Sequence, residues 1–245
     1  MDGRRERLRE PLRQQRFPRP PSARQGAFDH QRWRCRLARS LDPDAGGGSV
    51  SEGSNQLGVA GGGGDRHARV LLDPQRAALI VVDIQEAFAK AVGDFDGVAA
   101  AARKLVRGAH ILGLPVIVSE QYPRGLGPTV PELAELLDGD VRVEKRCFAA
   151  SAAEGFDLAG RTQALVCGIE AHVCVAQTAL ELLARGVAVH LVVDAVASRK
   201  AHDRDVALRR LELAGVVPQT VESALFELVR GADHPHFKEI QQLIK

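Results

Sequence analysis

Residues 78–83 read Ala-Leu-Ile-Val-Val-Asp, five apolar side chains in succession followed by a carboxylate. A strand that is apolar at every position has both faces covered, which is typical of a parallel sheet with helices on either side. Other short runs rich in β-branched residues recur along the chain and predict further strands at 115–119, 141–144, 164–168, 188–194 and 216–220. We therefore expect one mainly parallel sheet of six strands.

Longer segments whose apolar residues recur with helical periodicity separate these strands. They lie at 98–112, 131–137, 173–185 and 203–214, and two more are expected near 223–229 and 235–244. Strands that alternate with helices are typical of βαβ units. The sequence therefore predicts an α/β fold, a three-layer α/β/α sandwich.

The first 68 residues differ in composition from the rest of the chain. They hold 13 of the 33 basic residues, all of them Arg, and 8 of the 31 acidic residues. They are also rich in Pro, Gly and Ser, with few clustered apolar side chains to offset the entropy of ordering. We expect a disordered extension at 1–68 and a folded domain at 69–245. A mitochondrial presequence is the alternative for the Arg-rich segment, although its acidic residues depart from that pattern.

Composition also argues against several classes of protein. Residues 69–245 hold 20 basic and 23 acidic residues, so the positive charge of the chain belongs to the extension and does not indicate nucleic-acid binding. No run reaches the roughly 18 apolar residues that crossing a membrane requires. The four cysteines show no paired C-x-x-C spacing and follow no secretory signal, which favours a reducing, cytoplasmic environment.

Three reactive residues fall at the ends of predicted strands. Asp83 ends the first strand, Lys145 ends the third, and Cys174 follows the fourth at the start of a predicted helix. Functional groups collect at the carboxyl edge of open parallel sheets, so these residues are expected to meet. Each alone has an ordinary explanation, as a turn carboxylate, a solvated cation or a small buried thiol. Their convergence predicts a catalytic site.

The three residue types also suit one another chemically. The unpaired N–H groups of a helix start and the Lys145 ammonium are expected to lower the pKa of Cys174 and favour the thiolate. The Asp83 carboxylate can shuttle the proton, which completes an activated nucleophile. The helix-start N–H groups can also receive a developing oxyanion, which indicates acyl-type chemistry on a carbonyl carbon.

Several stretches resemble the motifs of the isochorismatase-like cysteine hydrolases, over residues 75–245. They are Val82-Asp83-Ile84-Gln85, Glu144-Lys145 and Gly168-Ile169-Glu170-Ala171-His172-Val173-Cys174-Val175. Residues 119–133, Ser-Glu-Gln-Tyr-Pro-Arg-Gly-Leu-Gly-Pro-Thr-Val-Pro-Glu-Leu, are further similar to the isochorismatase domain-containing and YcaC-like subgroup.

This resemblance implies a Rossmann-like sheet and a catalytic triad of Asp83, Lys145 and Cys174. It implies a non-proline cis peptide between Ile169 and Glu170, and an oxyanion hole formed by the backbone N–H groups of Glu170 and Cys174. It implies no cofactor. Oligomers are common in the family, so a homo-oligomer is expected.

Departures from relatives narrow the expected substrate. Nicotinamidases of this family hold a metal with an Asp and several His residues ahead of the catalytic Lys, whereas His110 is the only His between Asp83 and Lys145 here. A nicotinamidase and a metal site are therefore disfavoured. The family's true isochorismatases often do not depend on this Cys, so the presence of Cys174 and of the Gln-Tyr-Pro loop argues against isochorismate as well.

Residues near the strand ends are weaker candidates for a substrate pocket: Phe88, Glu120, Tyr122, Phe148 and His172. Loop aromatics cover cores as readily as they line pockets, and a packed structural role is favoured for His172. The Glu120 carboxylate is expected either to select a substrate amine or to pair with a loop Arg such as Arg124.

The leading hypothesis is a hydrolase of a small carbonyl-containing molecule, with amides among the candidates, that forms a covalent thioester on Cys174. One alternative is a non-catalytic binding or assembly protein on the same fold, which the intact triad disfavours. Another is a thiol-redox protein in which Cys147 resolves an oxidised Cys174, although a buried, inert Cys147 is favoured.

Overall fold

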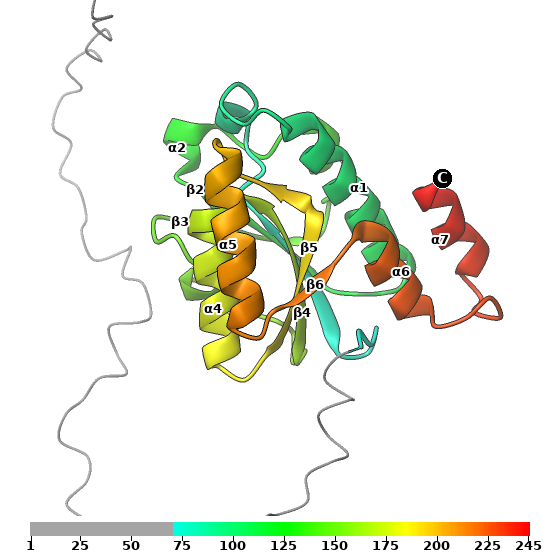
Figure 1. Cartoon of the computed structure of the whole chain (residues 1–245). Helices are drawn as coiled ribbons and strands as arrows, with labels where there is room; N and C mark the ends of the chain where they lie inside the picture. The colour runs from blue at the N-terminus through cyan, green and yellow to red at the C-terminus, as the bar shows by residue number, and fades with distance from the viewer. Residues whose placement is uncertain (1–70) are drawn as a thin grey trace, which may run out of the picture. The chain divides into compact units, whose positions relative to one another are not determined.

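The computed structural model describes residues 71–245, which contain a six-stranded sheet flanked by helices (Figure 1). The strands are β1 (Ala77–Val82), β2 (Val116–Gln121), β3 (Val141–Lys145), β4 (Gln163–Ile169), β5 (Ala188–Ala197) and β6 (Val217–Gln219). All neighbouring pairs are parallel, in the order β3-β2-β1-β4-β5-β6. The predicted parallel sheet is confirmed, and the expected extension at 1–68 lies outside the described residues.

Helices connect the strands. The longer ones are α1 (Phe95–Ile111), α4 (Ala176–Ala184), α5 (Ala201–Leu213), α6 (Val221–Val229) and α7 (Phe237–Ile244), and the single turns are η3 (Glu86–Phe88), α2 (Pro123–Leu126), α3 (Pro131–Ala134), η4 (Ala150–Ala152) and η5 (Ala171–Val175). The sequence did not predict η3, α2 or η4, because one turn is too short to show periodicity. Across residues 71–245, no helix combines the length and apolarity needed to cross a membrane.

Strand β1 shows how the sheet is covered on both faces. Leu79 and Val81 pack in one core cluster with residues of α1 and α6, whereas Ile80 and Val82 pack in another with residues of α4 and α5. Successive side chains of a strand point to opposite faces. Figure 1 accordingly shows α4 and α5 on one side of the sheet and α1, α6 and α7 on the other. The predicted three-layer sandwich is confirmed.

The strand order places a topological switch point between β1 and β4. From β1 the chain continues outward to β2 and β3, and from β4 it continues in the other direction to β5 and β6. Connections leaving the carboxyl ends of two such strands diverge, and ligands of open α/β sheets bind there. Asp83 follows β1 and Cys174 follows β4, so both lie at this point.

Gly168 lets β4 approach the end of β1 closely. Its φ is +124°, and a Cβ on this residue would lie 2.0 Å from the carbonyl oxygen of Val82. The pairing of β4 with β5 also shifts register between Val166 and Gly168. Only glycine fits a site that combines positive φ with such a backbone contact. The absence of a side chain at Gly168 thus allows the ends of β1 and β4 to lie this close together.

Candidate active site

The centre of the site is an ion pair between Asp83 and Lys145. Lys145 Nζ lies 2.6 Å from Asp83 Oδ2, and both side chains are fully buried. Lys145 ends β3 and Asp83 follows β1, so the lysine side chain reaches across the intervening strand β2. From β2, the hydroxyl of Ser119 donates a hydrogen bond of 2.7 Å to Asp83 Oδ1.

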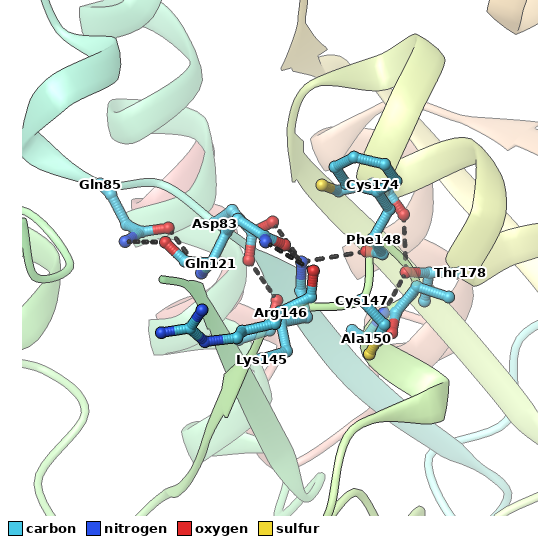
Figure 2. Close-up of polar contacts among 12 residues, drawn as sticks. Asp83, Gln85, Gln121, Lys145, Arg146, Cys147, Phe148, Ala150, Cys174 and Thr178 are labelled. Atoms are coloured by element: carbon cyan, nitrogen blue, oxygen red, sulfur yellow. Dashed lines mark hydrogen bonds and ion pairs between the residues drawn. The ribbon is translucent and has the colours of Figure 1, made fainter. Parts of the chain in front are cut away.

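Two further acceptors hold the Lys145 ammonium. Gln121 Oε1 lies 2.8 Å and the carbonyl oxygen of Phe148 lies 3.0 Å from Nζ. With Asp83, they match the three donors of an ammonium group. Figure 2 shows these groups converging on Lys145. The sequence did not indicate a role for Ser119 or Gln121 in the site, although their i, i+2 spacing on β2 puts both on one face.

Cys174 lies in a turn between β4 and α4. The turn η5 is a π-helical segment, in which the N–H of Val175 donates to the carbonyl oxygen of Glu170 at 3.2 Å. Such turns are rare and occur frequently at functional sites. The sequence predicted a regular helix from residue 173, because periodicity does not distinguish a π turn from an α turn. Cys174 is only 6% exposed.

The environment of Cys174 does not favour a thiolate at rest. The pKa of Cys174 is raised to about 12, mainly by burial and in addition by the nearby Asp83 carboxylate, while Lys145 acts in the opposite direction. The expectation of a lowered pKa is therefore wrong, because burial outweighs the effect of the Lys145 ammonium, which is also paired with Asp83. Burial also raises the pKa of Asp83, against the lowering effect of Lys145. The resting site holds a neutral thiol.

The peptide between Ile169 and Glu170 is cis, at the position that the family resemblance implied. The Glu170 carboxylate is engaged in an ion pair, because Arg199 Nε lies 2.5 Å from its Oε1. Nearby, His172 Nδ1 lies 3.0 Å from the hydroxyl of Ser198. The His172 side chain is 27% exposed, so its packed role, favoured over a role in a pocket, stays a prediction.

The Glu120 carboxylate makes hydrogen bonds that the sequence did not predict. Its Oε1 accepts hydrogen bonds from the backbone N–H and the hydroxyl of Thr129, at 2.8 and 2.6 Å. Both groups lie within hydrogen-bond distance in a buried environment, so Glu120 anchors the loop after α2 rather than pairing with Arg124. Phe88 packs against the core cluster that contains Leu79, as a residue that covers the core.

Two aromatic candidates lie at the surface beside the ion pair. Tyr122 is 43% exposed and Phe148 is 50% exposed. The backbone of each contacts Lys145: the N–H of Tyr122 donates to its carbonyl oxygen at 2.9 Å, and Phe148 accepts from its ammonium. The Arg146 guanidinium lies 4.7 Å from the centre of the Tyr122 ring. The backbones of both residues thus contact Lys145, and a role of their rings in a substrate pocket stays a prediction.

The sulfur of Cys147 does not face that of Cys174, as a redox pair would require. Its sulfur lies 3.6 Å from the carbonyl oxygen of Ala149, and Figure 2 shows it pointing away from the Cys174 sulfur. Neither Cys147 nor Cys174 forms a disulfide bond. In the part of the chain described, no three or more His, Cys, Asp or Glu side chains are grouped to hold a metal ion. His110 instead contacts Asp140, with Nε2 and Oδ2 2.9 Å apart.

Comparison with known proteins agrees with this architecture. Isochorismatase domain-containing protein 2A of Mus musculus is 45% identical over 175 residues, which cover 70% of this chain and 84% of that protein. The structure of MAR1 ribonuclease from Caenorhabditis elegans is 43% identical, with a TM-score of 0.68, and the match covers 71% of this chain and 92% of that one.

YcaC proteins are also similar in structure. YcaC from Pseudomonas aeruginosa, solved with hexane-2,5-diol and covalent acrylamide, is 30% identical with a TM-score of 0.66, covering 71% of this chain and 91% of that chain. YcaC from Escherichia coli, described as an octameric hydrolase of unknown specificity, is 26% identical with a TM-score of 0.65, covering 71% and 95%. The isochorismatase domain model matches residues 77–223, a span that contains Asp83, Lys145 and Cys174. This chain therefore belongs to the isochorismatase family.

Proposed function

We propose that this protein is a cysteine-dependent hydrolase of a small carbonyl-containing substrate, with Cys174 as nucleophile and Asp83 and Lys145 as its catalytic partners. The observation that carries the proposal is the buried 2.6 Å contact between Lys145 and Asp83, next to the Cys174 thiol. Burying two charges costs desolvation free energy. An ion pair kept beside a nucleophile at a switch point is therefore a candidate for function as well as structure.

The neutral resting thiol sets the first step. As Cys174 Sγ bonds to the substrate carbonyl carbon, the Asp83 carboxylate accepts the thiol proton. The carbonyl electron pair moves onto oxygen, and the backbone N–H groups of Glu170 and Cys174 are proposed to stabilise this oxyanion. When the intermediate collapses, the leaving group takes the proton from Asp83 and departs. A thioester on Cys174 remains.

Water completes the reaction. Asp83 accepts a proton from a water molecule as the water oxygen attacks the thioester carbon. The second intermediate collapses, the carbon–sulfur bond breaks, and Sγ takes the proton back from Asp83. The products are an acid and the original thiol, so one water is consumed and no cofactor is needed.

Lys145 makes this proton transfer feasible. Without a cation, burial would keep Asp83 protonated and unable to act as a base. The ammonium opposes the rise in the pKa of Asp83. Gln121 and Phe148 fix the ammonium between them, so its position does not depend on the substrate.

The substrate is proposed to be a small molecule, with simple amides among the candidates. Acrylamide is an electrophile to which thiols add, and the P. aeruginosa YcaC carries it covalently, which is the outcome expected of a reactive cysteine. Nucleic acid is not favoured, because residues 69–245 carry more acidic than basic groups. The ribonuclease name of the C. elegans relative nevertheless makes RNA a necessary comparison.

The test is a hydrolysis panel of small amides, related carbonyl compounds and RNA. Cys174→Ala should abolish hydrolysis of any accepted substrate, whereas Cys147→Ala, which removes a thiol outside the proposed triad, should retain it. Mass spectrometry should find an acyl adduct on Cys174 during turnover. Hydrolysis that survives Cys174→Ala would refute the proposal. Turnover of RNA alone would indicate a different enzyme, and absence of any turnover with a ligand bound would favour the binding-protein alternative.

We also propose a homo-oligomer in a reducing, cytoplasmic compartment, with a mitochondrial location as the alternative. The octameric E. coli YcaC supports assembly, and light scattering on the purified protein tests it. A mass equal to one chain at micromolar concentration would contradict it. Peroxide treatment followed by disulfide mapping tests the redox alternative, which requires a Cys147–Cys174 linkage.

A further inference from the structure

The side chain of Thr178 makes two hydrogen bonds inside the site. The residue is fully buried. Its Oγ1 donates to the carbonyl oxygen of Cys174 at 2.7 Å and accepts from the backbone N–H of Ala150 at 2.8 Å. Figure 2 shows the hydroxyl between these two groups. A hydroxyl has one proton to donate and lone pairs to accept with, so the donor and an acceptor position are both used.

The first of these bonds has an ordinary explanation. Threonine in a helix commonly donates to the carbonyl four residues earlier, which is the spacing of Cys174 and Thr178. The second bond does not follow from helix geometry, because Ala150 belongs to the η4 turn after β3. Thr178 therefore joins its own helix to a turn that lies 28 residues earlier in the chain.

Both segments carry groups of the triad. The loop that leads to Ala150 follows Lys145, and within it the carbonyl of Phe148 accepts a hydrogen bond from the Lys145 ammonium. The other segment is the π turn that holds Cys174. One hydroxyl thus links the loop that fixes the ammonium to the turn that presents the thiol.

We propose that Thr178 is a positioning residue that sets the distance between the Cys174 thiol and the Asp83–Lys145 pair. This inference deepens the proposed function and rests on it. Because Thr178 holds the carbonyl of Cys174, it orients the backbone from which Sγ and the proposed oxyanion N–H project. By holding Ala150, it keeps the Phe148 carbonyl in place under Lys145. The residue acts through these groups and touches no reacting atom.

The hydroxyl, rather than the volume of the side chain, is the feature that matters. Thr178→Val keeps the shape and removes the hydroxyl, and it leaves the buried N–H of Ala150 without its partner. Thr178→Ser keeps the hydroxyl and removes only the methyl. Thr178→Ala, compared with Thr178→Ser, again differs by the hydroxyl alone. Two independent pairs of variants therefore isolate the same atom.

The experiment measures the rate at which acrylamide modifies Cys174, by mass spectrometry of the Cys174 peptide, as a function of pH. We expect Thr178→Val to slow modification at neutral pH by about tenfold to a hundredfold, the range for misplacement of a reacting group. Its rate should also begin to rise at a higher pH than in the wild type, because a displaced Lys145 opposes the raised pKa of Cys174 less. Thr178→Ser should match the wild-type rate within about twofold and keep the wild-type pH profile.

A merely structural role predicts a different pattern. Thr178→Val would then lower the melting temperature and leave the rate and pH profile of the folded protein unchanged, which would overturn the proposal. If Thr178→Val does not fold, equal pH profiles for Thr178→Ser and Thr178→Ala would overturn it in the same way. The readout needs no substrate, so it remains decisive even if the hydrolysis panel finds none. Failure of the proposed function would instead appear as turnover that survives Cys174→Ala.

Discussion

Replacing Lys145 by Met should destabilise the protein strongly, although Met preserves much of the side-chain volume. The Lys145 and Asp83 side chains are fully buried and lie 2.6 Å apart. Removing the cation leaves a buried carboxylate with only neutral side-chain neighbours, the Ser119 hydroxyl and the Cys174 thiol, to stabilise its charge. Breaking one side of a buried pair costs about 3–5 kcal/mol of unfolding free energy. At roughly 2–4 °C per kcal/mol for a domain of this size, the melting temperature should fall by roughly 6–20 °C.

The loss of unfolding free energy in Lys145→Met should grow as the pH rises. Burial raises the pKa of Asp83, and Lys145→Met removes the charge that opposes this rise. A group whose pKa is raised in the folded state contributes stability below its unfolded pKa, near 3.9 for Asp, and loses it as pH rises through the folded pKa. The difference between wild type and Lys145→Met should therefore be small near pH 4 and large near pH 8, as measured by urea unfolding.

Two controls make this prediction specific. The exposed pair His236–Glu239 has its atoms 3.0 Å apart with side chains 44% and 58% exposed, and Glu239→Gln should cost under about 1 kcal/mol. The double variant Asp83→Asn/Lys145→Met should lose less than the sum of the single variants, because it leaves no uncompensated charge. Additive losses, each as small as that of Glu239→Gln, would refute the reasoning.

Four further outcomes are expected. Asp83→Asn should abolish hydrolysis and lower the pKa of Cys174 by about 1 to 3, because it removes a nearby negative charge; ultraviolet titration of the thiolate checks this. Gly168→Ala should destabilise by at least about 3 kcal/mol in chemical unfolding, whereas Gly113→Ala, where φ is also positive but no atom lies within 4 Å, should lose about 1 kcal/mol. Removing residues 1–64 should leave the melting transition and activity unchanged. Chelators should not inactivate the enzyme, and inactivation that zinc reverses would contradict this.

The sequence by itself determined the sheet and the residues that meet at its edge. Uninterrupted apolar runs such as 78–82 have no polar face, so each had to become a strand covered on both sides. The rule that functional groups gather at the carboxyl ends of parallel strands then brought Asp83 and Cys174 to the switch point between β1 and β4, where the structure has them. Neither inference needed side-chain positions.

Only the tertiary structure decided what those residues are able to do. The pKa of Cys174 is raised instead of lowered, because it depends on burial and on the distances to Asp83 and Lys145 together. Neither the burial of Cys174 nor its distances to Asp83 and Lys145 can be derived from the spacing of residues in the sequence. Likewise, Thr129 donates hydrogen bonds to the Glu120 carboxylate because the loop after α2 returns to β2. The path of that loop cannot be read from the sequence. Hydrogen bonds between distant segments, such as that of Thr178 with Ala150, form only where packing has already brought the segments together.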